Sequence, residues 1–295
     1  MITSKPTTPQ SQRMKGILAI LCAAFFFALM TAFVRLAGDL PSVQKSFFRN
    51  LVALLFATAV LLRTPEKFRF EKSNLGALLM RSVFGTIGIL GNFYAVDHLL
   101  LSDASMLNKL SPFFAIIFSF FLLKEKMRPI QILAVVLAFI GSLFIIKPSG
   151  HGLLSAGAFA GVLGGLGAGV AYTYVRILGK RGERGPFIVF FFSGFSCIAT
   201  LPFLIFDYHP MSLTQVCFLL LAGLSAAGGQ FSITTAYTFA PAKEISVFDY
   251  TQVIFAAVLG FFLFGQVPDL YSLLGYFIIC SVSVAMFFYN KKCIL

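Results

Sequence analysis

The sequence predicts an all-α membrane protein in which ten transmembrane helices form two inverted five-helix repeats. Three observations lead to this fold class. Hydrophobic residues fill 58% of the 295 positions and charged residues only 12%, about half the charged share of a soluble domain. The apolar residues gather in ten runs, each long enough to cross a bilayer. The chain also resembles itself at a single offset of 141 residues.

Each apolar run is expected to form one helix, because crossing a hydrocarbon core roughly 30 Å thick takes about 20 helical residues. The connections are short and contain turn-forming Pro and Gly, so none can hold a soluble domain. The first repeat is placed at 16–148 and the second at 153–289, between tails 1–15 and 290–295. The predicted spans are 16–36, 43–62, 75–96, 103–123, 129–146, 153–178, 187–206, 214–239, 245–264 and 271–289.

The distribution of Lys and Arg predicts the orientation. The net charge of +12 is spread in small groups between the apolar runs, which argues against a nucleic-acid partner and for membrane topology. With the N-terminus in the cytoplasm, 17 of the 23 cations fall on the cytoplasmic side. We therefore expect a multi-pass protein of the bacterial inner membrane with both termini cytoplasmic.

The internal repeat predicts how the two halves are related. At the offset of 141, Gly16 matches Gly157, and Val34-Arg35-x-x-Gly38 matches Val175-Arg176-x-x-Gly179. Five spans per repeat is an odd number, so the halves must have opposite topology. Inverted repeats are typical of secondary transporters, whose binding site lies near the bilayer midplane where the repeats meet.

Several short motifs occur along the chain after residue 15. They are Arg81-x-x-x-Gly85, Tyr94-Ala95, Ser102-Asp103-Ala104, Ser111-Pro112, Lys124-Glu125-Lys126, Ala236, Pro241-Ala242 and Phe264-Gly265-Gln266-Val267-Pro268. With these motifs essentially the whole chain after residue 15 resembles the EamA family of drug/metabolite transporters. The resemblance implies two EamA repeats and a proton-coupled or exchange carrier of small organic metabolites. Phe47-Phe48-Arg49, together with Arg81-x-x-x-Gly85, is similar to the subgroup of S-adenosylmethionine uptake carriers.

Four ionisable residues lie well inside predicted spans: Arg49, Arg81, Lys109 and Asp249. A charge facing lipid costs about 2.5–3.5 kcal/mol on insertion scales, so each is expected to face protein or water. Counting along the helices places Arg49 and Lys109 in the outer half and Arg81 and Asp249 in the inner half, where these two can pair. The alternative for the cations is snorkelling to the headgroups.

The balance of these four residues predicts the substrate chemistry. Three cations and one acid favour a substrate with a carboxylate or phosphate, bound by charge-assisted hydrogen bonds. Asp249 has a short side chain and cannot snorkel far, which makes it the candidate for coupling transport to a proton or to an exchanged solute.

Polar residues beside Pro112 suggest a second part of the site. Proline cannot donate a backbone hydrogen bond, so it frees the carbonyl of Asn108 four residues earlier, and such backbone is tolerated at membrane depth where it lines a cavity. Together with Lys109 and Ser111 we interpret this segment as cavity lining; the alternative is a kink that only shapes the helix. Asn108 and Lys109 match Asp249 and Tyr250 at the repeat offset, so Tyr250 joins the candidates.

The remaining candidates lie on polar stripes of other spans. Arg81, Gly85, Gly88 and Asn92 share one helix face, with Tyr94 close by. Gln230 and Tyr237 belong to a comparable stripe of the eighth span, and Gln252 lies in the ninth. Each could instead be a polar contact between helices. A ladder of Gly157, Gly161, Gly165 and Gly169 predicts close helix packing, with a sliding surface as the alternative.

The combined prediction is a secondary active transporter that moves a small carboxylate-bearing metabolite, such as an amino acid or an S-adenosylmethionine-like solute, by alternating access. Its expected partners are that solute, the lipid bilayer, and protons or an exchanged solute. No cofactor or metal is predicted, because Walker, metal-binding and nucleophile motifs are lacking from the sequence. The alternatives are an integral membrane enzyme, which would usually need clustered acids or His, and a passive channel.

Overall fold

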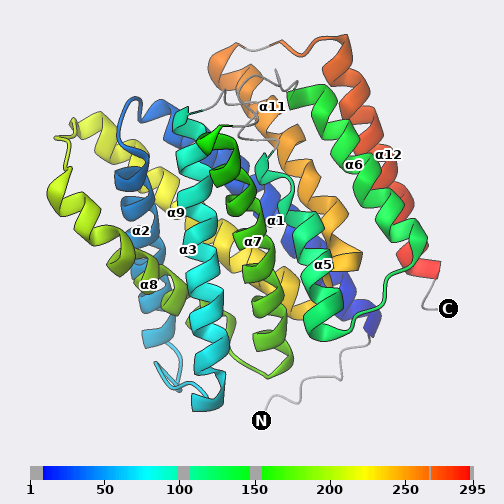
Figure 1. The fold of residues 1–295 in the computed structure, drawn as a ribbon, viewed down its shortest axis with the longest axis horizontal. Helices are drawn as coiled ribbons and strands as arrows, with labels where there is room; N and C mark the ends of the chain where they lie inside the picture. The colour runs from blue at the N-terminus through cyan, green and yellow to red at the C-terminus, as the bar shows by residue number, and fades with distance from the viewer. Residues whose placement is uncertain (1–8, 99–106, 147–154, 266, 293–295) are drawn as a thin grey trace.

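A computed structural model describes residues 9–98, 107–146, 155–265 and 267–292, which form a bundle of helices with no strand in these ranges (Figure 1). The helices of the first half are α1 (Pro9–Leu36), α2 (Ser42–Leu62), η1 (Lys72–Asn74), α3 (Leu75–His98), α5 (Ser111–Leu123) and α6 (Pro129–Ile146). Those of the second half are α7 (Ala156–Lys180), α8 (Gly185–Phe206), α9 (Leu213–Phe239), α10 (Ala242–Ile245), η2 (Ser246–Tyr250), α11 (Thr251–Phe264) and α12 (Leu270–Lys292).

The helices agree closely with the predicted spans. Eight segments are long and apolar enough to cross a membrane, and α5 and α6 are shorter apolar helices. Helix α1 begins at Pro9, so residues 9–15 of the predicted N-terminal tail are helical. Residues 103–106 and 153–154 of the predicted spans lie outside the described residues.

Two spans predicted as continuous helices are interrupted. In the span predicted at 103–123, residues 109–110 form a turn and α5 begins only at Ser111. Pro112 therefore occupies the first turn of a helix, where its missing N–H costs nothing, and does not kink a longer one. The span predicted at 245–264 begins at Ala242 and changes from α10 to the 3-10 helix η2 and then to α11. Short 3-10 segments inside helices often mark hinges.

The helices of the two halves pack mainly against each other. Helix α1 lies along α9, α3 lies along α7, α2 packs on α8, and α6 packs on α12. In addition, α5 contacts α7 and α11 contacts α1. The halves are thus interlocked, and the space between them is surrounded by helices of both.

Glycines on α7 allow this close packing. A Cβ on Gly165 would meet the carbonyl oxygen of Leu107 at 2.8 Å, and one on Gly169 would meet the Cβ of Phe114 at 2.5 Å. Another face of α7 meets α3, where a Cβ on Gly164 would lie 2.8 Å from the backbone nitrogen of Asn92. The predicted packing role of the glycine ladder is confirmed at Gly165 and Gly169.

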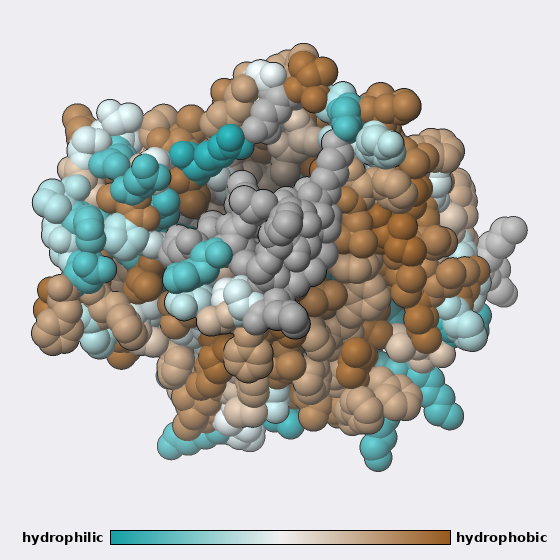
Figure 2. All heavy atoms as spheres, turned by 45° about the horizontal axis from the view of Figure 1, so that its top comes forward, coloured by the Kyte–Doolittle hydropathy of each residue, from teal (hydrophilic) through white to brown (hydrophobic). Residues whose placement is uncertain are grey.

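The surface has the banded character of a membrane protein. Figure 2 shows a flank covered mainly by hydrophobic residues, with hydrophilic residues gathered along both edges. Exposed Phe side chains such as Phe121, Phe206 and Phe262 contribute to the apolar surface. This surface and the eight long apolar helices are those of a multi-pass membrane protein.

Candidate functional site

A cavity of about 710 Å³ lies between the two halves. Its lining extends to Asp39 and Val267, which are exposed near the ends of α1 and α11. These ends lie opposite the described ends of the chain, at the top of Figure 1. Hydrophilic residues gather on part of that face in Figure 2. The cavity therefore reaches one end of the bundle.

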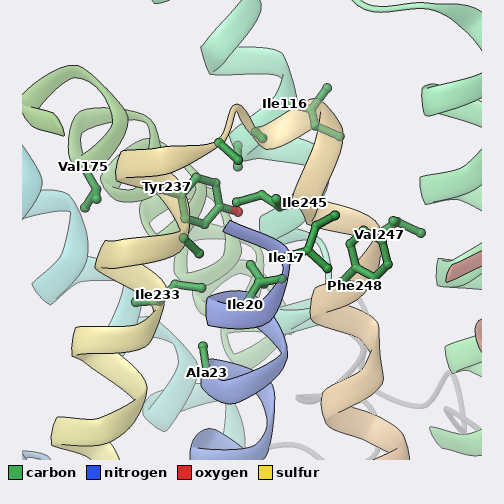
Figure 3. Close-up of a cluster of buried hydrophobic side chains, with 14 of the residues drawn as sticks. Ile17, Ile20, Ala23, Ile116, Val175, Ile233, Tyr237, Ile245, Val247 and Phe248 are labelled. Atoms are coloured by element: carbon green, nitrogen blue, oxygen red, sulfur yellow. The ribbon is translucent and has the colours of Figure 1, made fainter. Parts of the chain in front are cut away.

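The other end of the cavity is closed by a hydrophobic cluster (Figure 3). Ile20 and Ala23 of α1 pack there against Ile233 and Tyr237 of α9, and all four are at most 1% exposed. Ile245 and Phe248 approach the same cluster from α10 and η2.

Charged contacts lie beyond this cluster, at the end of the bundle where α1 begins. The Arg13 side chain forms an ion pair with Glu244, with a second contact from Nη2 to Oε1 at 2.7 Å. Lys180 contacts Glu125 at 2.8 Å, and Lys243 donates to the carbonyl of Lys126 at 2.6 Å. These contacts join helices of both halves on the closed side.

The lining of the cavity contains an ion pair. Lys109 Nζ lies 3.4 Å from Asp249 Oδ2 and donates to Gln252 Oε1 at 2.7 Å. The two charged side chains are only 7% and 11% exposed. Each comes from an interrupted span, Lys109 from the turn before α5 and Asp249 from η2. Tyr250 Oη donates to the carbonyl of Lys109 at 3.0 Å, so the two interruptions are bound directly to each other.

Two arginines form a second polar group in the cavity lining. Arg81 of α3 is 2% exposed and donates from Nη2 to Gln230 Oε1 at 3.1 Å. Its guanidinium carbon lies 4.0 Å from the centroid of the Phe192 ring, a cation–π contact. Arg49 of α2 is 6% exposed and also lines the cavity.

The structure brings most of the predicted site residues together. Nine of the twelve candidates line this one cavity: Arg49, Arg81, Asn92, Asn108, Lys109, Ser111, Gln230, Asp249 and Gln252. The predicted stripe of α3 is also present, since Gly85 and Gly88 line the cavity beside Arg81 and Asn92.

Three tyrosines are not part of the lining. Tyr94 is 43% exposed and stacks on His98; it follows Asn92 by two residues, which is about 200° around the helix. Tyr237 shares the face of Gln230 but lies two turns, about 10 Å, further along α9, inside the hydrophobic cluster. Tyr250 is fully buried and bonds to the Lys109 backbone.

The predicted pairing of the charges is wrong. Asp249 pairs with Lys109 and not with Arg81, which bonds to Gln230. Lys109 and Asp249 were also expected at different depths, yet they are in contact. The prediction counted residues along uninterrupted helices, whereas both residues lie where a span is interrupted.

Two aromatic residues outside the predicted set of site residues contribute to the site. Phe192 covers the face of the Arg81 guanidinium, and Tyr172 lines the cavity and stacks on Tyr237 with centroids 4.9 Å apart. With 37 Phe in the chain, nothing in the sequence distinguishes Phe192. The one indication in the sequence is Arg81 itself, since an arginine inside a predicted span requires partners from facing helices.

The arrangement can bind a solute but has no sign of bond-making chemistry. Within the described residues, no group of three His, Cys, Asp or Glu side chains could hold a metal ion. The charged groups that line the cavity are amines, guanidinium groups and the carboxylates of Asp39 and Asp249, which suit recognition of a charged solute.

Comparison with known proteins decides the family. The sequence matches the EamA-like transporter family twice, over residues 14–147 and 155–288. The chain belongs to the EamA-like transporter family. The predicted resemblance to this family and its two repeats is thereby confirmed, and the similarity to S-adenosylmethionine carriers stays a prediction.

Relatives of this family member are transporters. It is 30% identical over 273 residues to the pseudopaline exporter CntI of Pseudomonas aeruginosa, covering 92% of this chain and 95% of the relative. It is 26% identical over 274 residues to human solute carrier family 35 member G1, covering 88% and 75%. It is 25% identical over 267 residues to a riboflavin transporter of Brucella anthropi, covering 85% and 90%.

A solved crystal structure shares the fold with a TM-score of 0.82 at 13% identity, covering 95% of this chain and 99% of that one. The family match and the named relatives, and not this likeness of fold, make the EamA-like family member a membrane transporter with a small-molecule substrate. The alternative of an integral membrane enzyme is set aside by the family.

Proposed function

We propose that the protein is a secondary active transporter that moves a small carboxylate-bearing metabolite across the bacterial inner membrane by alternating access. The observation that carries the proposal is the cavity of about 710 Å³ between the halves. Its polar lining reaches one end of the bundle, and a hydrophobic cluster closes the other. Alternating access requires such a central site with one closed side.

The helix contacts support ten spans arranged as two inverted repeats. A shift of 141 residues exchanges α1 with α7 and α3 with α9, so the contact of α1 with α9 becomes that of α7 with α3. The contacts of α2 with α8 and of α6 with α12 map onto themselves. Lys109 and Tyr250 are equivalent by the same shift and bind each other, as residues beside a two-fold axis do.

This symmetry gives a physical basis for switching. If each half can adopt the conformation of the other, a second state of similar energy opens the side that is now closed. With both termini in the cytoplasm, the present cavity opens to the outside. The Arg13–Glu244 and Lys180–Glu125 pairs then hold the cytoplasmic side closed.

The coupling step is assigned to the Lys109–Asp249 pair. The pair joins the interrupted spans of the two halves in the lining of the cavity. Protonation of Asp249, or binding of an exchanged solute to Lys109, would remove the attraction between the two interruptions. Because both conformations need these segments to move relative to each other, the charge state of Asp249 would control the exchange between them.

The test is transport by purified protein in liposomes. A panel of amino acids, S-adenosylmethionine, nucleotides and organic anions is measured with and without a pH gradient. For the solute that is taken up, Asp249→Asn and Arg81→Ala are expected to abolish coupled transport while the protein still inserts. Arg63→Ala removes an exposed cation at the end of α2, outside the cavity, and is expected to transport normally.

Two outcomes contradict the proposal. Full uptake by both Asp249→Asn and Arg81→Ala would reject the assigned site. Flux that rises linearly with concentration, without saturation or acceleration by solute on the opposite side, would indicate a passive channel.

A further inference from the structure

The two buried arginines of the cavity are not neutralised by the protein. Within the residues that the structure describes, no salt bridge connects Arg49 or Arg81 to an acidic side chain, and the Nε atom of each has no hydrogen-bond partner. Both side chains are at least nine-tenths buried. A buried charge without a counterion is costly, so these two groups are expected to have a ligand.

The contacts of Arg81 fix the direction from which that ligand approaches. Phe192 covers one face of the guanidinium plane at 4.0 Å, and Gln230 accepts one N–H bond at 3.1 Å. Guanidinium donors lie in the plane of the group and match the two oxygens of a carboxylate or phosphate. Arg49 of α2 lines the same cavity as Arg81 of α3, and α2 packs against α3. The two cations therefore lie on contacting helices of the lining.

The charge balance of the deep cavity limits the substrate. Among the described residues, Lys109 is matched by Asp249, which leaves the two positive charges of Arg49 and Arg81. A zwitterion would leave both uncompensated, and a monoanion would leave one. Near the entrance, the charged side chains of the described lining are Arg35, Lys45 and Asp39, a net positive set that also attracts anions.

We propose that the substrate is a small organic dianion whose two negative charges neutralise Arg49 and Arg81. This rests on the proposed transport function and specifies the substrate of the same site. A dicarboxylate and a phosphate monoester share the required chemistry. A dicarboxylate would give one carboxylate to each guanidinium, whereas a phosphate monoester would share its oxygens between them.

The first experiment measures ligand binding by thermal unfolding of the full chain in detergent. The probes are the dicarboxylates from malonate to pimelate, the monoamide of each at the same concentration, and glycerol 3-phosphate. A ligand that binds only the folded protein raises the unfolding temperature. We expect at least one dianion to raise it and the monoamide, which has the same shape and one charge less, to have little effect. Whichever type raises the unfolding temperature more, the dicarboxylates or glycerol 3-phosphate, identifies the class of dianion that the site binds.

The second experiment repeats the titration with variants. Arg49→Gln and Arg81→Gln are each expected to weaken binding of the best dianion about 10- to 100-fold, the usual effect of losing a charged hydrogen bond. Arg49→Lys keeps the charge but not the planar donors, and is expected to lie in between. Arg63→Gln is the matched control on the same helix and is expected to bind normally. Unfolding without ligand shows whether each variant is folded.

Several results would overturn the inference. These are stabilisation by monoamides as strong as by the dianions, no stabilisation by any dianion of the panel, or unchanged binding in folded Arg49→Gln and Arg81→Gln. If a neutral or cationic solute is transported in an Asp249-dependent manner, the dianion proposal fails while the transport proposal stands. If dianions bind through both arginines but nothing is transported, the transport proposal fails while the proposal of a dianion site stands.

Discussion

The Lys109–Asp249 pair should contribute more to stability than an exposed pair of the same length. At 3.4 Å, the Coulomb energy of two unit charges is about 5 kcal/mol for an effective dielectric constant near 20. Removing both charges from water offsets a large part of this. With the side chains 7% and 11% exposed, we expect a net coupling of about 2 kcal/mol.

The assay is a double-mutant cycle with Lys109→Met and Asp249→Asn, followed by equilibrium unfolding in mixed detergent micelles. The cycle isolates the pair from other effects of each substitution. Arg184 and Glu66 provide the control, since their closest atoms are also 3.4 Å apart but the side chains are 26% and 58% exposed. The control pair is expected to couple by less than about 1 kcal/mol. Equal coupling in both cycles, or none at the buried pair, would refute the reasoning.

Two further predictions concern packing and the closed side. Gly169→Val should lower the free energy of unfolding by about 1–3 kcal/mol or more, because its Cβ would lie 2.5 Å from Phe114 Cβ. The control is Gly76→Ala, whose Cβ would have nothing within 4 Å and which should change the free energy of unfolding by less than about 1 kcal/mol. Equal effects of the two substitutions would contradict this packing. Glu244→Gln should break the pair with Arg13 and populate the state open to the cytoplasm. The measurement is the thiol reactivity of Ala23→Cys, at a position that is 0% exposed in the present state, with and without Glu244→Gln. If Glu244→Gln does not raise this reactivity, the Arg13–Glu244 pair does not hold the cytoplasmic side closed.

The positions of the helices could be predicted because the bilayer imposes their length. The predicted span at 43–62 corresponds to α2 (Ser42–Leu62) and that at 214–239 to α9 (Leu213–Phe239). The interruptions at 109–110 and in η2 could not be predicted in this way. Hydropathy counts apolar side chains and is insensitive to a change from α-helix to 3-10 helix, and η2 contains no proline to indicate one.

The charged part of the site could be predicted because charges inside a membrane are too costly to be incidental. Arg49, Arg81, Lys109 and Asp249 all line the cavity. Their partners could not be assigned, since pairing depends on where the interruptions place each side chain. The position of Tyr237 could be predicted only in part. Its helix face follows from the sequence, but its burial in the hydrophobic cluster depends on how α1 packs against α9.

The central claim is that one cavity is reached alternately from the two sides of the membrane. Ala257 lines this cavity, and Ala257→Cys in a variant without the five native Cys is labelled with a membrane-impermeant thiol reagent. Intact spheroplasts expose the outer side and inverted vesicles the cytoplasmic side. The account predicts labelling from the outside in this variant, and added labelling from the cytoplasmic side when Glu244→Gln is introduced. Labelling from the same single side in both variants would contradict it.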